Sequence, residues 1–145
     1  MFKEMVDKKH YSFHEGFDDW RDAVKAACQP LLDDGTINPE YPEIIIQKVE
    51  ELGPYIVIAP NICIPHAERG RGVNDTAMCF MKTEKPVQFD ENDRDKDARL
   101  FVVLAATDDE VHLNNLMQLS ETLSDEAVVE KLLQAKTAED LTAIG

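Results

Sequence analysis

The feature that most constrains the fold of this sequence is a short, uninterrupted apolar run from Leu100 to Leu104. The run is rich in branched and aromatic side chains and is too short to form a buried helix of ordinary length. Continuous apolar runs of this kind are typical of strands that are covered on both faces. The run therefore predicts a central strand at about residues 100–106, with other elements packed on either side of it.

The rest of the chain alternates between extended and helical patterns. The segments predicted as strands are 55–59, 62–64 and 76–81, and the first of these is expected to be buried. Apolar residues at helical spacing predict helices at 18–33, 39–52, 111–123 and 125–135, with a short last helix from residue 137. Residues 1–17 show no clear period. Interleaved helices and strands indicate an α/β class with one central sheet, whose strand order the pattern does not give.

Length and charge limit the possible functions. The chain has 145 residues, which predicts a single domain spanning residues 1–145. Its 15 basic and 29 acidic residues give a net charge of −14, which argues against binding nucleic acid or an anionic membrane surface. A basic protein partner and a merely soluble surface both remain compatible with this charge.

The sequence also predicts where the protein resides. No apolar stretch reaches the ~18–20 residues of a membrane span, and the first residues lack the features of a signal peptide. A cytoplasmic protein is therefore expected. The three cysteines, Cys28, Cys63 and Cys79, are widely spaced in apolar surroundings, so we expect small core residues rather than a disulfide framework or a zinc site.

His66 is the first candidate for chemistry. It follows a short extended segment and Pro65, which stiffens the backbone, and it precedes a loop that contains Arg69 and Arg71. In α/β folds, ligand sites lie where strands end in such loops. The two arginines favour an anion, most naturally a phosphate. A neutral imidazole has a lone pair, so His66 could act as a nucleophile, or it could simply be satisfied by a backbone hydrogen bond.

His112 is the second candidate. It lies at the start of the predicted helix 111–123, directly after the central strand. Helix N-termini present free N–H groups that attract anions, and a histidine there can hydrogen-bond a phosphate oxygen. Asp108, Asp109 and Glu110 would repel an anion, so we expect them to cap the helix and point outward. Two strand ends that each deliver a histidine predict that both meet at one edge of the sheet.

The other groups of polar residues concern possible metal-binding sites. His10 and His14 are four residues apart and would share one face of a helix, which is a possible metal-binding arrangement. The acidic run 90–97 is expected to form a solvated loop, because it lacks the spacing of a calcium-binding loop. His66, Glu68 and His112 would supply the ligands if the protein were a metal-dependent hydrolase.

Several segments together resemble a known family, the EIIA domain of the sugar phosphotransferase system, of the mannitol/fructose type. The stretch from Gly53 to Ala67 is most similar to the L-ascorbate-specific branch, and its apolar-Pro-His-small end is the most specific part. The other matching residues are Trp20-x-Asp22-Ala23-Val24, Pro39-x-Tyr41, Gly72-Val73, Pro86-Val87-Gln88-Phe89 and Val111-His112. The resemblance extends from about Trp20 to Ile144.

The resemblance implies a single α/β domain with a central mixed sheet flanked by helices. It implies that His66 accepts a phosphoryl group from the phosphocarrier HPr and passes it to a cysteine of a cognate EIIB protein, which serves the membrane permease EIIC. The residue that matches His112 would hydrogen-bond the phosphoryl group. No metal and no cofactor are implied.

Two departures from the family pattern concern the site. Position 63 is usually a small residue and is Cys63 here. Mannitol-type members carry an arginine in the helix before the Pro-His segment, and this chain has none there. Lys48 and Arg69 are the candidates for its phosphate-binding role. A regulatory module similar to the nitrogen-type branch, which is phosphorylated without feeding a transporter, is the alternative function.

Overall fold

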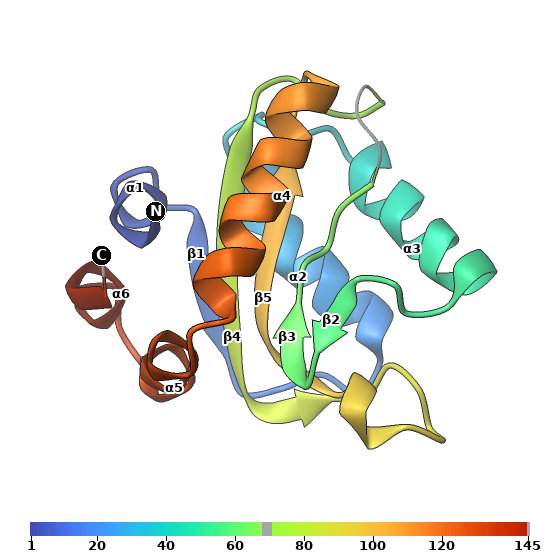
Figure 1. Ribbon diagram of the computed structural model, residues 1–145. Coiled ribbons are helices and arrows are strands. Elements are labelled where there is room, and N and C mark those ends of the chain that lie inside the picture. The colour runs from blue at the N-terminus through green and yellow to red at the C-terminus, as the bar shows by residue number, and fades with distance from the viewer. Residues whose placement is uncertain (68–70, 145) are drawn as a thin grey trace.

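The computed structural model describes residues 1–67 and 71–144, which form a sheet with helices on both faces (Figure 1). The N-terminal half contains α1 (Phe2–Asp7), β1 (Tyr11–His14), α2 (Trp20–Asp33), α3 (Glu40–Leu52), β2 (Val57–Ala59) and β3 (Asn61–Cys63). The C-terminal half contains β4 (Ala77–Val87), the short 3-10 helix η1 (Arg94–Lys96), β5 (Ala98–Ala105), α4 (Asp109–Leu123), α5 (Glu126–Gln134) and α6 (Ala138–Ile144). No described helix is both long and apolar enough to cross a bilayer.

The sheet is mixed, as the resemblance implies. Its strand order is β1-β4-β5-β3-β2. β4 is parallel to β1 and antiparallel to β5, whereas β3 is parallel to β5 and antiparallel to β2. The pairing of β3 with β5 matters most for the site, because neighbouring parallel strands end at the same edge of a sheet.

The apolar run at residues 100–104 forms the centre of the sheet, as predicted. All five of its side chains are at most 1% exposed. Successive side chains in a strand point to opposite faces, so Phe101 and Val103 join the core beneath α2 and α3, and Leu100, Val102 and Leu104 join the core beneath the other helices. Covering both faces is what allows an uninterrupted apolar strand.

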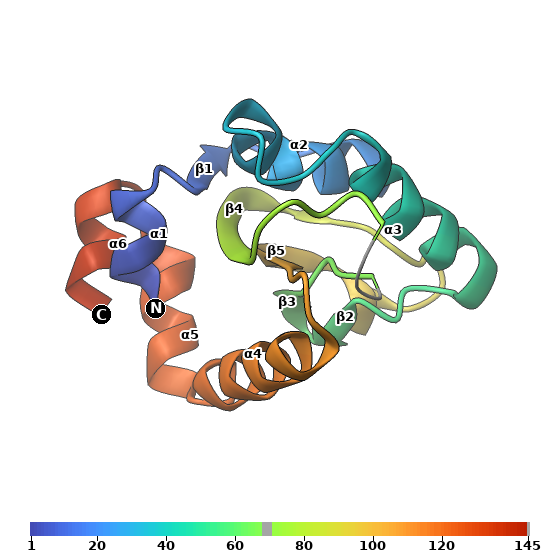
Figure 2. The ribbon, with the colours of Figure 1, turned by 90° about the horizontal axis from the view of Figure 1, so that it is seen from above.

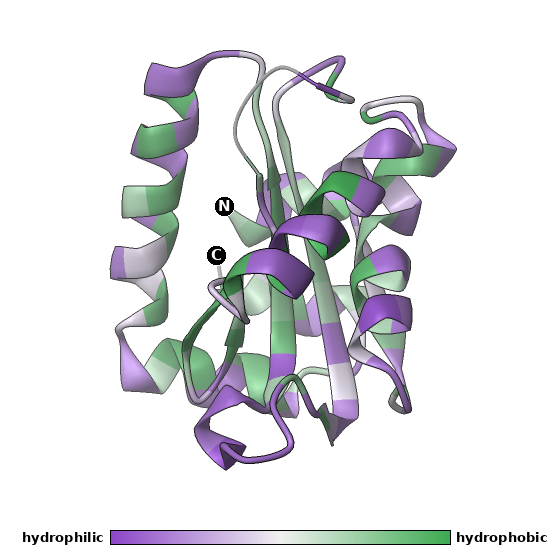
Figure 3. Ribbon diagram, turned by 90° about the vertical axis from the view of Figure 1, so that its right-hand side faces the viewer, coloured by the Kyte–Doolittle hydropathy of each residue, from purple (hydrophilic) through white to green (hydrophobic). Residues whose placement is uncertain are grey.

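The helices divide into two layers. α2 and α3 lie on one face, and α1, α4, α5 and α6 lie on the other, with α1 beside α6 so that both ends of the chain are close together (Figures 1 and 2). Hydrophilic and hydrophobic residues alternate along the helices, as amphipathic covering helices require (Figure 3). α2 begins directly after Asp19, whose carboxylate caps the helix by accepting a hydrogen bond from Arg21 N at 2.9 Å.

Two predictions about strands were wrong in part. The segment 55–59 was expected to be a buried strand, but β2 begins only at Val57 and is the edge strand, so Ile58 is 43% exposed. β4 was expected to end near residue 81 but continues to Val87. The continuation is polar and still contains the buried Lys82, whose Nζ lies 3.1 Å from Glu84 Oε2.

The first 17 residues contain two elements that the sequence pattern did not indicate, α1 and β1. α1 has only two fully buried residues, Phe2 and Met5, which is too few to establish a period. β1 is a short strand whose first three residues are partly exposed. It is stabilised by pairing with the distant β4, and local propensity carries little information about such pairing.

Candidate functional site

The parallel pairing of β3 with β5 brings two histidines together. His66 follows the end of β3, and His112 lies in the first turn of α4, which follows β5. The centroids of the two imidazole rings are 5.7 Å apart, and the rings are inclined at 48°. The sequence predicted this convergence from the two strand ends alone.

The His66 ring is held in one orientation by its own segment of chain. Its Nδ1 lies 2.6 Å from the carbonyl oxygen of Ile64. A carbonyl oxygen only accepts hydrogen bonds, so Nδ1 carries the proton, and in the neutral ring the lone pair resides on Nε2. Burial lowers the pKa of His66, and the neighbouring His112 lowers it further, although the bond to Ile64 acts in the opposite direction. The arrangement favours a neutral imidazole with a nucleophilic Nε2.

The backbone before His66 is anchored to β5 and to the turn that precedes β2. Ile64 N donates a hydrogen bond to Ile56 O at 2.7 Å, and Leu104 N donates one to Pro65 O at 3.0 Å. Proline also fixes its own φ, so the segment has little freedom. The histidine thus leaves the sheet from a stiff support.

Two tyrosines hold the backbone after His66. The Tyr55 hydroxyl donates to the carbonyl oxygen of His66 at 2.5 Å, and the Tyr55 ring meets the imidazole edge to face at 5.4 Å. The Tyr41 hydroxyl donates to Leu104 O at 2.5 Å and accepts from Ala67 N at 3.2 Å. Sequence reasoning placed both tyrosines in structural elements and assigned them no role in the site. The sequence signal that could have identified them is a tyrosine in an apolar segment, because a buried hydroxyl needs a hydrogen-bond partner.

His112 has an unsatisfied ring nitrogen. Its Nδ1 is buried and has no hydrogen-bond partner among the described residues. Buried polar atoms are nearly always paired, so this nitrogen is available to a bound group. Burial lowers the pKa of His112, and the negative charge of Asp109 opposes that shift.

The N-terminus of α4 is less open to an anion than we expected. The Asp108 carboxylate caps the helix, as predicted, and accepts hydrogen bonds from Glu110 N at 2.8 Å and Val111 N at 3.1 Å. These N–H groups are therefore already occupied. An anion at this edge would have to rely on the His112 side chain more than on the end of the helix.

The remaining predicted site residues are placed only in part. Lys48 lies half-buried on α3. Arg69 and Glu68 fall outside the described residues. Arg71 is exposed, and its Nη2 lies 3.8 Å from Glu40 Oε2 at the start of α3. The phosphate-binding roles of Lys48 and Arg69 stay predictions.

The pairing of His10 with His14 on one helical face was wrong. His10 precedes β1 and His14 ends it, so the segment is extended. His10 is buried and its Nε2 lies 2.5 Å from Asp34 Oδ2, whereas His14 packs against Phe17. Within residues 1–67 and 71–144, no group of three or more His, Cys, Asp or Glu side chains is arranged to hold a metal ion.

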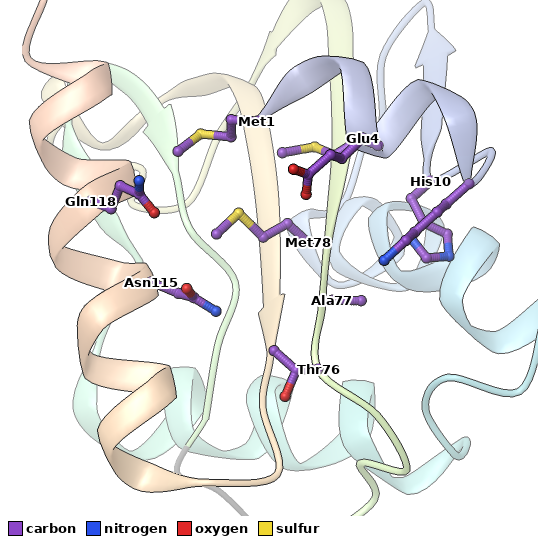
Figure 4. A pocket seen from close by; sticks show the side chains of 10 residues that line it. Met1, Glu4, His10, Thr76, Ala77, Met78, Asn115 and Gln118 are labelled. Carbon is purple, nitrogen blue, oxygen red and sulfur yellow. The ribbon is translucent and has the colours of Figure 1, made fainter.

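A cavity of about 230 Å³ lies elsewhere, between α1, α4 and the start of β4. Asn115 and Gln118 extend into it from α4, across from Glu4 and His10, with Met78 between the two sides (Figure 4). Neither His66 nor His112 lines this cavity. Both histidines are partly exposed at the edge of the sheet, so a partner protein could reach them there.

Comparison with known proteins gives one family. Residues 4–144 match the family described as phosphoenolpyruvate-dependent sugar phosphotransferase system, EIIA 2. Among curated relatives, the ascorbate-specific PTS system EIIA component of Salmonella choleraesuis is 32% identical over 123 residues, which cover 84% of this chain and 79% of that protein.

Solved structures show the same fold. A putative PTS IIA, PtxA, from Streptococcus mutans superposes with a TM-score of 0.86 at 28% identity, over 97% of this chain and 88% of that one. The mannitol-specific cryptic phosphotransferase enzyme IIA CmtB from Escherichia coli gives a TM-score of 0.85 at 29% identity, over 99% of this chain and 97% of that one.

Proposed function

The chain belongs to the EIIA 2 family of the phosphoenolpyruvate-dependent sugar phosphotransferase system, and from this we propose that it carries a phosphoryl group on His66. The donor would be the phosphohistidine of HPr, and the acceptor a cysteine of a cognate EIIB protein that serves an EIIC permease. The observation that carries the proposal is the His66 ring, whose Nδ1–H is bonded to Ile64 O so that Nε2 has the lone pair.

Phosphoryl transfer depends on positioning and charge stabilisation more than on covalent assistance. Nε2 of His66 attacks phosphorus, a new N–P bond forms, and the N–P bond of the donor breaks with its electron pair returning to the donor imidazole. Nδ1 keeps its proton and its bond to Ile64 throughout, so His66 loses no proton in this step. In the second step a cysteine thiolate of EIIB attacks, an S–P bond forms, and the electron pair returns to Nε2.

His112 is the proposed partner of the phosphoryl oxygens. Its ring centroid is 5.7 Å from that of His66, and its buried Nδ1 lacks a partner among the described residues. A phosphoryl oxygen would supply that partner, provided that Nδ1 carries a proton. Lys48 and Arg69 remain the proposed sources of further positive charge.

The transported sugar is inferred from the relatives. The curated protein cited above is named as ascorbate-specific, and we assign this chain to L-ascorbate uptake on that basis. A regulatory module of the nitrogen type would also be phosphorylated on a histidine. The two functions differ in whether an EIIB cysteine receives the group.

The direct test uses the purified chain with enzyme I, HPr and radiolabelled phosphoenolpyruvate. His66→Gln should abolish labelling, whereas the matched change His14→Gln, at an exposed histidine of β1, should leave it intact. His112→Ala should still be labelled slowly but should pass the group on poorly. Substantial labelling of the His66→Gln variant would refute the assignment of the carrier residue.

The acceptor is tested by adding EIIB proteins to the isolated phosphorylated chain. We expect rapid transfer to an ascorbate-type EIIB cysteine and slow transfer to a mannitol-type one. Transfer to the mannitol type alone would overturn the choice of sugar. If label remains on the chain with every EIIB protein, the regulatory alternative is correct.

A further inference from the structure

We infer that Tyr55 and Tyr41 are positioning residues that together immobilise the peptide bond following the phosphoryl-accepting histidine. The inference rests on the proposed function for its kinetic consequence, but not for its geometry. Neither tyrosine hydroxyl is assigned to the chemistry of the transfer, because each is bonded to backbone atoms.

The two hydroxyls bind opposite sides of one peptide unit. Tyr55 donates to the carbonyl oxygen of His66, and Tyr41 accepts from the amide nitrogen of Ala67. That carbonyl and that amide belong to the same planar peptide group, so the two bonds fix its position and its rotation. Fixing the plane fixes ψ of His66 and φ of Ala67.

The hydroxyls come from two different elements. Tyr41 lies in the first turn of α3, and Tyr55 lies in the turn before β2. Tyr41 also donates to Leu104 O in β5, so one phenol connects the helix, the central strand and the His66 segment. The Tyr41 side chain is 1% exposed, and burial raises its pKa far above the usual range, which keeps it a neutral donor and acceptor.

The imidazole needs such an external anchor. Its Nδ1–H bond goes to Ile64 O, an atom two residues earlier in the same segment. That bond orients the ring relative to its own backbone, but it cannot hold the backbone in place relative to the sheet. Hydrogen bonds from Leu104 N to Pro65 O before the histidine and from the two tyrosines after it provide that attachment.

Position matters here because the phosphoryl group passes between two proteins. The attacking Nε2 must lie in line with the bond that breaks, and a misplacement of about 1 Å can cost about a hundredfold in rate. The T-shaped contact of the Tyr55 ring with the imidazole adds lateral support. A phenylalanine at position 55 would keep this ring contact and remove only the hydroxyl.

The test measures the rate of His66 phosphorylation by phospho-HPr over a range of HPr concentrations. We expect Tyr55→Phe and Tyr41→Phe each to lower the maximal rate about tenfold, and to leave the half-saturating HPr concentration unchanged. The matched control is Tyr11→Phe, which alters the remaining tyrosine of the chain, in β1 at the far edge of the sheet, and should change neither quantity.

The double variant separates joint from independent action. Two groups that hold one peptide are not additive, so Tyr41→Phe with Tyr55→Phe should be slowed about tenfold to twentyfold, and not by the roughly hundredfold product. A fully multiplicative loss would overturn joint action on the peptide. Unchanged maximal rates in both single variants would overturn the positioning role.

A readout without phosphorylation keeps the inference independent of the proposed function. Hydrogen exchange of the Ala67 amide should speed up in Tyr41→Phe, because that amide loses its acceptor, and should be unaffected in Tyr11→Phe. Unchanged exchange in Tyr41→Phe would contradict the geometry. If the wild-type chain is never phosphorylated although exchange responds as expected, the proposed function fails, whereas the positioning of the peptide by the two tyrosines is upheld. Tyr55 is only partly buried, so Tyr55→Phe remains testable even if Tyr41→Phe does not fold.

Discussion

Gly72 is the position at which one added methyl group would disturb the contact between α3 and the chain that follows His66. Its φ is +80°, a conformation that L side chains rarely adopt. A Cβ atom there would lie 2.9 Å from Tyr41 N and 2.9 Å from Glu40 Cγ, closer than real carbon atoms approach. Gly72 O also accepts a hydrogen bond from Asn38 N at 2.8 Å, so the glycine cannot withdraw without loosening the start of α3.

Two costs add in Gly72→Ala. Left-handed backbone costs an alanine about 1 kcal/mol. Relieving the contact with the backbone of Tyr41 costs about 2 kcal/mol, as overpacking typically does. We expect the free energy of unfolding to fall by about 3 kcal/mol, which lowers the urea midpoint by about 2 M at an m-value of about 1.5 kcal/mol/M.

Gly35→Ala is the matched control. Gly35 has a similar φ of +78°, but no described atom lies within 4 Å of an added Cβ. This variant should lose only the backbone cost of about 1 kcal/mol, or about 0.7 M in midpoint. Urea titration followed by the fluorescence of Trp20, which stacks on Phe89, measures both changes. Equal losses in the two variants would refute the close approach at Gly72.

Four further outcomes are expected. Burial lowers the pKa of His66 below 6.5, so the phosphorylation rate should rise with pH through that lowered pKa and be level above about pH 6.5. The same shift should lower the free energy of unfolding as the pH falls below 6.5, because the unfolded chain binds the proton first. NMR titration of the ring measures the pKa, and urea midpoints against pH measure the loss of stability. Asp108→Ala removes the cap of α4, and Asp125→Ala removes that of α5. Each should lower the free energy of unfolding by about 1 kcal/mol in urea titration. No loss in either variant would contradict the cap hydrogen bonds. All three thiols are buried, and burial raises the pKa of Cys28 to about 12. A disulfide reagent at pH 8 should therefore label no thiol in the native protein and all three in urea. Rapid labelling of the native protein would contradict this burial.

Elements with strong local signals could be predicted from the sequence. The apolar run at residues 100–104, the helical spacing of α2 to α5 and the capping residue Asp108 all lie where the pattern places them. Weakly patterned elements were missed, because α1 and β1 are stabilised by distant contacts with α6 and β4. The second half of β4 was missed because its polar residues resemble a loop, and Lys82 is buried only through its place in the fold.

His66 and His112 could be singled out from their place after two predicted strands, and local chemistry sufficed for that. Their predicted meeting comes about through the parallel pairing of β3 with β5, a strand order that the pattern did not give because the paired segments are about 40 residues apart. The tyrosine contacts are equally non-local, since the Tyr41 hydroxyl bonds to a carbonyl 63 residues away and an amide 26 residues away. Periodicity reports which face of an element is buried, whereas a hydroxyl finds its partner only after the elements have packed. The sequence alone was therefore enough to identify the two histidines of the site. The hydrogen bonds that position them were decided only by the tertiary structure.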